Sequence, residues 1–320
     1  MGADRAARSP LVSQWLAGQL VISDCGISTG KRFYVDSGGT YGSDAGGYGH
    51  SPDAPKLTLD EPFADAIVTA SNGDIIYCMP GHAENLAADS TVDMDIAGVK
   101  VVGIGQGASR PTFTCTVDTG DFKLAAAGSV IENILFSNDI DNSTGMVEVS
   151  AADCKILDCE FREADAAKFA DMLVLTTADA DFLEIARCNF TMNAGDGSVS
   201  AISIVGSDQV HIHDCWIYGD FSAANIDVAG TAATLLRVHD CTLWNDDDTA
   251  GADNVQVVKD TVTASTGVIG PNIFAFLGVD AENITGAING ATFIVNPAGC
   301  FVVNAAGEMG KALDWAASTG

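Results

Sequence analysis

The fold is decided by the phrase "IHDCWI" at residues 212–217, which returns as "VHDCTL" at residues 238–243. Related phrases stand upstream, with "ILDCEF" beginning at Ile156, "IARCNF" at Ile185 and the weaker "IENILF" at Ile131. Their central positions recur about every 25 to 30 residues and are Ile134, Cys159, Cys188, Cys215 and Cys241. A period of this length is typical of a solenoid, in which each unit buries its apolar face by stacking on its neighbours.

The pattern within each copy indicates which solenoid forms. The first, fourth and sixth positions are apolar, and the third is Asn133, Asp158, Arg187, Asp214 or Asp240. Alternation on both sides of that position predicts two short strands joined by a bend, where Asn or Asp tolerates a left-handed backbone. Leucine-rich and helical repeats would show different spacings. We therefore expect an all-β fold, a right-handed, single-stranded parallel β-helix with a capping N-terminal segment and a C-terminal β-rich tail.

The repeated cysteines have a structural role in such a fold. Each coil supplies one thiol at the same inward position, which predicts a core ladder made of Ile134, Cys159, Cys188, Cys215 and Cys241. A metal site would need ligands that converge on one point, with spacings such as C-x2-C. A redox or metal role, or chance disulfides, are the less favoured alternatives. The adjacent His213 and His239 are interpreted as outward surface residues, so we expect no catalytic residue, no metal ligand and no cofactor.

The composition of the chain limits the classes of partner that it could bind. The chain has 320 residues, 43 of them acidic and 15 basic, with a formal net charge of −28. Such a surface repels phosphate backbones and anionic lipids, which argues against nucleic-acid and membrane binding. The N-terminal residues lack the apolar core of a signal peptide, and an odd number of cysteines, nine, suits reduced thiols. We expect a protein made in the cytoplasm.

Four segments are predicted along the chain. Residues 1–30 form an N-terminal arm, and residues 31–98 form a cap module with a short helix around residues 59–70. The coils are expected over residues 99–250, and a β-rich tail that is a candidate for oligomerisation covers residues 251–320.

A family resemblance rests on longer motifs. The stretch "FYVDSGGTYGSDAGGYGHSPDAPKLTLDEPFADAI", followed by "NGDIIYCMPGHAENL", resembles the first module of right-handed β-helix proteins. Together with "VDMDIAGVKVVGIGQGASRPTF" and the ending "NAAGEMGKALDW", it is similar to structural proteins of tailed-bacteriophage virions. The resemblance covers most of residues 33–315. Because β-helices serve many functions, it is more specific for fold than for role.

Two functions follow from this resemblance. The first is a non-enzymatic capsid decoration or cement protein, usually trimeric in such phages, that binds the major capsid protein on the exterior of the virion. The second is a tailspike-type receptor-binding protein or polysaccharide depolymerase with two carboxylates flanking a glycosidic bond. Glu160 and Glu163 are the pair considered for such catalysis, but residues this close to a turn are more often solvated. The decoration protein is the favoured interpretation.

Two sets of residues are candidates for contacts with other subunits. Trp15, Leu16 and Leu20 lie at helix spacing beside Arg5 and Arg8, which predicts a segment that docks on the capsid. The candidates for a subunit interface are the aromatic and apolar residues Trp216, Trp244, Ile273, Phe274 and Phe276. The alternatives are that one or both tryptophans turn into the core and that the last three belong to an ordinary final coil.

Overall fold

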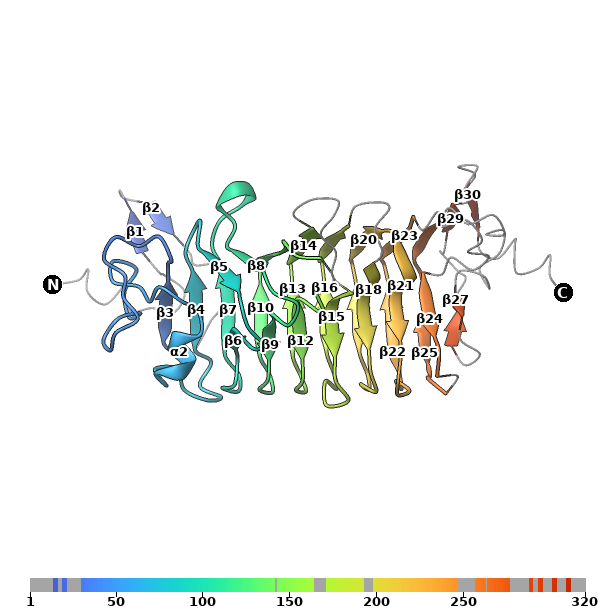
Figure 1. Ribbon diagram of the computed structural model, residues 1–320, viewed down its shortest axis with the longest axis horizontal. Helices are drawn as coiled ribbons and strands as arrows, with labels where there is room; N and C mark the ends of the chain where they lie inside the picture. The colour runs from blue at the N-terminus through green and yellow to red at the C-terminus, as the bar shows by residue number, and fades with distance from the viewer. Residues whose placement is uncertain are drawn as a thin grey trace.

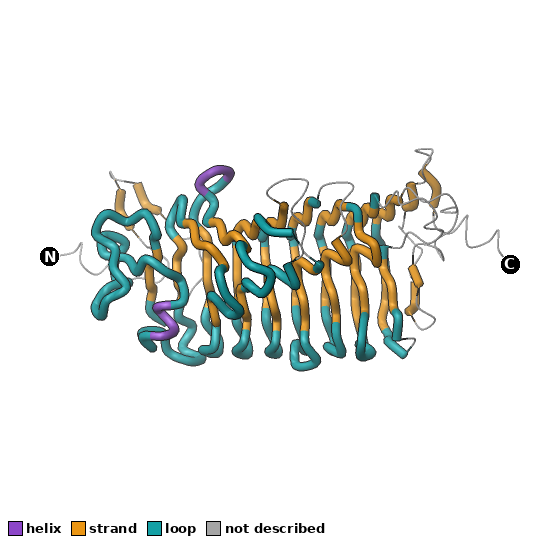
Figure 2. The backbone as a smooth tube through the Cα atoms, viewed as in Figure 1, coloured by secondary structure: helices purple, strands orange, loops and turns teal. Residues whose placement is uncertain are grey.

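The computed structural model describes most of the chain between residues 30 and 276. The described residues are 14–16, 19–21, 30–141, 143–163, 171–192, 198–246, 257–262, 264–276, 288–289, 293–295, 301–303 and 309–311. Short strands stack along one long axis to form an elongated column (Figure 1). Loops join them at the edges of the column (Figure 2).

The first sheet has ten strands, all paired in parallel with their neighbours. Its order in space is β3 (Arg32–Val35), β4 (Ile75–Cys78), β7 (Lys100–Gly103), β10 (Val130–Glu132), β13 (Lys155–Leu157), β16 (Glu184–Ala186), β19 (His211–His213), β22 (Leu236–His239), β25 (Gly267–Ile269) and β28 (Phe293–Val295). The strand that begins each repeated phrase belongs to this sheet.

The second sheet also has ten strands and contains the second half of each phrase. Its order is β5 (Ala83–Leu86), β8 (Thr112–Cys115), β11 (Leu135–Asn138), β14 (Glu160–Glu163), β17 (Asn189–Thr191), β20 (Trp216–Gly219), β23 (Thr242–Asn245), β26 (Ile273–Phe276), β29 (Phe301–Val303) and β30 (Met309–Lys311). Only the last pair, β29 with β30, is antiparallel.

A third sheet of eight strands closes each turn. Its order is β6 (Val92–Asp93), β9 (Phe122–Leu124), β12 (Val147–Val149), β15 (Met172–Thr176), β18 (Ser198–Ile204), β21 (Phe221–Val228), β24 (Val258–Asp260) and β27 (Ile288–Asn289). From β4 to β27 each turn contributes one strand to each sheet, so the fold is an all-β parallel β-solenoid, which confirms the predicted fold class.

The bend between the first and second sheets has the expected backbone conformation. Its five residues, Asn133, Asp158, Arg187, Asp214 and Asp240, have φ angles between 54° and 57°. The side-chain amide of Asn133 donates to the carbonyls of Gly103 and Gly105 at 2.8 and 3.0 Å. These bonds tie the corner of one turn to the corner of the turn before it.

Aromatic stacking fills the core beside the second sheet. The rings of Phe136 and Phe161 lie 5.0 Å apart, and those of Phe161 and Phe190 lie 4.5 Å apart and almost parallel, at 5°. All three side chains are fully buried. Because parallel pairing places equivalent residues one above the other, a phenylalanine at the last position of three successive phrases becomes a continuous stack.

The solenoid begins earlier than expected. β4 pairs in parallel with β7, and β3 pairs with β4, so the first sheet extends into the segment expected as a cap module before residue 99. The expected helix over residues 59–70 is only the single turn α2 (Glu61–Ala64), and a 3-10 turn, η1, spans Gly107–Ser109. In the parts of the chain that the structure describes, no helix has the length and apolar character needed to span a membrane.

The helix spacing expected near the N-terminus is wrong. Trp15 and Leu16 belong to β1 (Gln14–Leu16), which pairs antiparallel with β2 (Gln19–Val21), and Trp15 lies opposite Leu20. Only Ala17 and Gly18 separate the two strands in the sequence. Gly destabilises a helix interior but is favoured in two-residue hairpin connections, so the same apolar spacing is compatible with a hairpin.

Candidate functional site

The structure places the predicted ladder inside the solenoid. Ile134, Cys159, Cys188, Cys215 and Cys241 are all buried, and the four cysteines are free thiols. Burial raises the pKa of Cys188 well above its ordinary value, because a thiolate would be poorly solvated there. All four thiols are inaccessible to a substrate, because their side chains are buried in the core. These positions are therefore not candidates for catalysis.

Glu160 and Glu163 do not form an acid pair. The carboxylate of Glu160 accepts a hydrogen bond from Arg110 at 2.8 Å on the outside of β14. Glu163 is buried, and the hydroxyl of Ser198 lies 3.4 Å from its carboxylate. The two side chains thus have separate partners and different environments.

The structure describes three of the residues considered for a subunit interface, Trp216, Trp244 and Ile273. Trp216 is 46 % exposed and lies in register with Thr242, whereas Trp244 lies in register with Tyr218 and contacts its ring edge-to-face at 5.5 Å. The tryptophans therefore do not lie one above the other, and neither is in the core. Ile273 is 40 % exposed at the start of β26. The side chains of Phe274 and Phe276 lie outside the described set, as do Arg5 and Arg8 of the expected docking segment.

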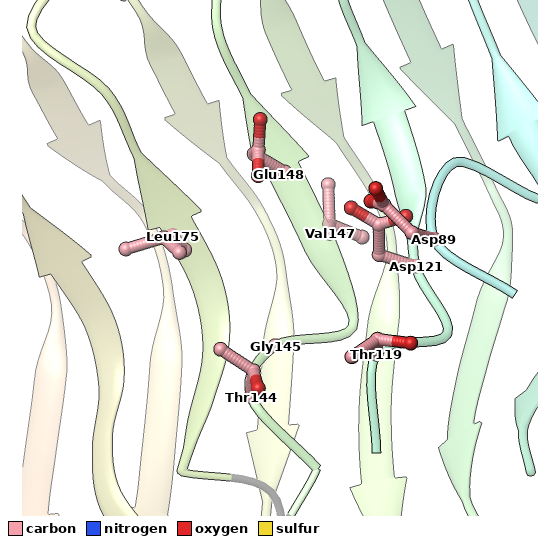
Figure 3. A pocket seen from close by; sticks show the side chains of 8 residues that line it. All are labelled: Asp89, Thr119, Asp121, Thr144, Gly145, Val147, Glu148 and Leu175. Atoms are coloured by element: carbon pink, nitrogen blue, oxygen red, sulfur yellow. The ribbon is translucent and has the colours of Figure 1, made fainter. Parts of the chain in front are cut away.

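The best candidate site lies on the third sheet, in a depression of about 300 Å³ that we call the acidic cleft. It is lined by Asp89, Thr119, Asp121, Thr144, Gly145, Val147, Glu148 and Leu175. Figure 3 shows the carboxyl groups of Asp89 and Asp121 next to each other, with Glu148 on the neighbouring strand β12. Its volume is at the lower end of the range for small-molecule sites, about 300 to 1,000 Å³.

Asp121 has the most unusual environment in the cleft. It directly precedes β9, it is only 7 % exposed, and its carboxylate accepts a hydrogen bond from the backbone N–H of Ser90. Burial, together with the nearby charges of Glu148 and Asp89, raises its pKa to about 6, although the bond from Ser90 and the charge of Lys123 oppose the shift. A carboxyl group with this pKa can hold and release a proton near neutral pH.

Glu148 is the second carboxyl group of the cleft. It projects outward from β12 between the buried Val147 and Val149, in register with Lys123 of β9 and Leu175 of β15. The ammonium group of Lys123 lies 2.8 Å from its Oε1, and this bond raises the pKa of Lys123. The pairing holds Glu148 in one orientation while leaving its side chain 24 % exposed.

Sequence reasoning missed this cleft because it followed the repeated phrase and therefore only two of the three strands in each turn. A usable signal was present outside the phrases, where "FKL" at residues 122–124 and "VEV" at residues 147–149 alternate buried and outward residues. The sequence does not show, however, that Asp89, Asp121 and Glu148 face the same depression, because they come from three successive turns of the solenoid.

Comparison with known proteins identifies no family. No family model matches the sequence, and no curated protein matches it. Among solved structures, a chain described as a rhamnogalacturonan lyase is similar, with 13% sequence identity and a TM-score of 0.46. The match covers 78% of this chain and 74% of that chain. The functional inference therefore rests on this chain's own side chains.

Proposed function

We propose that the protein is a tailspike-type glycan hydrolase that cleaves a polysaccharide in the acidic cleft. The observation that carries the proposal is the buried carboxyl group of Asp121, whose pKa is raised to about 6, beside a second carboxyl group at Glu148. Glycoside hydrolysis generally uses two carboxyl groups with different environments, one as acid and one as base or nucleophile. This revises the expectation of a non-enzymatic protein.

The two environments suggest which group has which role. Asp121 is the general acid, because burial favours its protonated form and it can protonate the leaving glycosidic oxygen. Glu148 is the base or nucleophile, because its outward carboxylate is oriented by Lys123. The proton leaves Asp121 as the glycosidic bond breaks, and a water molecule finally supplies the hydroxyl group on the anomeric carbon and returns a proton to the enzyme.

The charge of the cleft favours a neutral or basic glycan. The residues that line it include three carboxyl groups and no Lys or Arg. A uronic-acid polymer would be repelled, and lyase chemistry on a uronate would require cations to neutralise its carboxylate. Thr119 and Thr144 offer hydroxyl groups for hydrogen bonds with sugar hydroxyls, and Val147 and Leu175 offer apolar contacts.

The test is a reducing-end assay on a panel of neutral, basic and acidic bacterial surface polysaccharides. We expect the wild-type protein to shorten at least one neutral or basic glycan and the Asp121→Asn variant to be at least about 100-fold slower. Wild-type protein that cleaves nothing in the panel, or an equally active Asp121→Asn variant, would contradict the proposal.

A second candidate is the non-enzymatic capsid decoration protein. It is favoured by Trp216 and Ile273, which are 46 % and 40 % exposed and lie in one outward column of the second sheet, with Thr242 between them. Exposed apolar columns suit contacts between subunits of a trimer or with a major capsid protein. Electron microscopy of a particle that carries this chain would locate it on the shell or on the tail. A tail position would exclude the decoration protein.

A further inference from the structure

A second depression, of about 460 Å³, lies on the outer face of the first sheet, and we call it the first-sheet groove. Its lining comes from strands β16, β19, β22 and β25 and from residues just before them, so it spans four successive turns. The volume falls within the range of small-molecule sites, about 300 to 1,000 Å³. The groove shares no lining residue with the acidic cleft, which lies on the third sheet.

One side of the groove is part of a column of residues that precede the strands of the first sheet. The column has left-handed φ angles between 56° and 73° in six successive turns, at Gly98, Gly128, Asp153, Phe182, Gln209 and Leu235. Glycine adopts this conformation without steric cost, whereas a bulky side chain is strained in it. Phe182 and Leu235 are nevertheless 50 % and 57 % exposed, so burial in the core does not offset the strain. Backbone strain that the fold does not require is typical of binding sites.

The other side of the groove carries an arginine that is available to a ligand. The outward residues of the four strands lie in register and are Glu184, His211, Arg237 and Val268. Arg237 is exposed and makes no ion pair with any residue that the structure describes. Glu184 does not neutralise it, because the Glu184 carboxylate contacts Lys155 and His213. A guanidinium group without such a partner can bind a carboxylate through two parallel hydrogen bonds.

We propose that the first-sheet groove binds a small molecule with an apolar body and one carboxylate group. The carboxylate pairs with Arg237, and the apolar body packs against the exposed side chains of Phe182, Leu235 and Val268. Charge selects this class of ligand, because the chain has a formal net charge of −28 and yet, in its described part, the groove presents a guanidinium group without an ion-pair partner. The proposal does not depend on glycan hydrolysis, because the acidic cleft has its own lining residues.

A pair of histidines lies beside Arg237. Nε2 of His211 lies 2.6 Å from Nε2 of His239, whose Nδ1 lies 2.7 Å from the carboxylate of Asp240. Because a carboxylate only accepts hydrogen bonds, Nδ1 of a neutral His239 carries the proton, and its Nε2 accepts a hydrogen bond from His211. The other charged groups around the pair are His213, Asp214, Glu184, Arg237 and Lys155.

This pair should make ligand binding depend on pH. Burial, together with the nearby charges of His213, His239 and Arg237, lowers the pKa of His211, although Glu184 opposes the shift. His211 therefore gains its charge only below neutral pH. The added positive charge lies next to Arg237, so the affinity for a carboxylate should rise as the pH falls from about 7 to about 5.5.

The test is a methyl NMR titration of the full chain with 4-phenylbutyrate, in about 0.15 M salt to screen the charge of the chain. We expect saturable shifts at the methyl groups of Leu235 and Val268, with a dissociation constant of about 1 mM or lower. The methyl groups of Val147 and Leu175 in the acidic cleft should not shift. The uncharged analogue 4-phenylbutan-1-ol should bind at least about tenfold more weakly, because it cannot form charge-assisted hydrogen bonds with Arg237.

Variants of the groove test each part of the proposal. Arg237→Gln should weaken binding at least about tenfold. Its matched control is Arg32→Gln, at the corresponding outward position of β3 at the far end of the same sheet, which should bind as the wild-type protein does. Phe182→Gly should weaken binding at least about threefold and leave the melting temperature nearly unchanged, because glycine fits the left-handed backbone. In His211→Ala the affinities at about pH 7 and about pH 5.5 should be equal.

Several outcomes would overturn the proposal. They are equal binding by Arg237→Gln, equal binding of the alcohol, shifts that avoid Leu235 and Val268, and an affinity of the wild-type protein that does not rise at lower pH. Binding of glucuronate without binding of 4-phenylbutyrate would assign the groove to an acidic sugar instead. Shifts of the same methyl groups on dilution, without any ligand, would assign it to a contact between two copies of the chain.

Discussion

The ammonium group of Lys123 lies 2.8 Å from Oε1 of Glu148, one turn further along the same outer face of the third sheet. A comparable pair, Lys100 with Glu132, joins neighbouring strands of the first sheet, whereas the cleft lies on the third sheet. Glu132 is therefore a matched control residue for Glu148, because the same kind of ion pair occurs inside and outside the acidic cleft.

Glu148→Gln should abolish most glycan cleavage while changing stability little. Removal of the base or nucleophile is expected to lower the rate at least about 100-fold. Loss of a partly exposed ion pair should change the free energy of unfolding by only about 0 to 1 kcal/mol. Glu132→Gln should match it in chemical denaturation but retain full activity. Equal activity of the two variants would remove Glu148 from the mechanism.

Asp121 should make stability and activity respond to pH in a defined direction. Its pKa is about 6 in the folded chain and about 3.9 in an unfolded one, so between these values the folded state binds more protons. The free energy of unfolding should therefore fall as pH rises from about 4 to about 6, and this component should be absent from Asp121→Asn. At pH 7 the variant should be more stable than the wild-type protein, by up to about 3 kcal/mol, and at least about 100-fold slower in glycan cleavage. Denaturant titrations across this pH range, with rate measurements, provide the check.

Gly120 positions Asp121 by close backbone packing. A Cβ atom at Gly120 would lie 2.2 Å from the carbonyl oxygen of Leu86 in the previous turn, whereas one at Gly145 would find its nearest neighbour at 3.6 Å. Gly120→Ala should lower the melting temperature and glycan cleavage together, because the backbone must shift next to the acid. Gly145→Ala lies in the same cleft and should fold with wild-type stability. A fully stable and active Gly120→Ala would contradict this packing argument.

The stacked phenylalanines beside the second sheet should make a large contribution to the free energy of unfolding. Phe161 lies between the rings of Phe136 and Phe190, and Phe161→Ala should lower the free energy of unfolding by about 3 to 5 kcal/mol because it leaves a cavity inside a stiff column. Phe161→Leu, which keeps most of the volume, should cost clearly less. Urea unfolding of both variants measures the difference.

A separate prediction concerns the stability and the chemical accessibility of the buried thiols. Cys215→Ala should cost about 1 to 2 kcal/mol, and Cys215→Asp far more, because it buries a charge. A thiol reagent should leave Cys159, Cys188, Cys215 and Cys241 unmodified in the native protein. Rapid labelling of these positions would contradict their placement in the core.

The sequence alone determined the repeat and its consequences for the backbone. A phrase that returns every 25 to 30 residues requires equivalent residues to stack, and this predicts the inward cysteines and the left-handed corners at Asp158 and Asp214. Local alternation is sufficient for these features, because each depends on the residues of one phrase and on its copies. The same local reasoning failed for Trp15 and Leu20, where hairpin and helix share a similar apolar spacing.

Only the tertiary structure decided which outward side chains meet. Asp89, Asp121 and Glu148 lie in different turns, and His211 meets His239 across two strands separated by more than twenty residues of chain. The register between turns and the lengths of the connecting loops determine these contacts. Neither can be predicted from the residues of one repeated phrase. The pKa of Asp121 likewise depends on burial and on charges brought in by neighbouring turns. For this reason the candidate acid could be recognised only after the solenoid had been assembled.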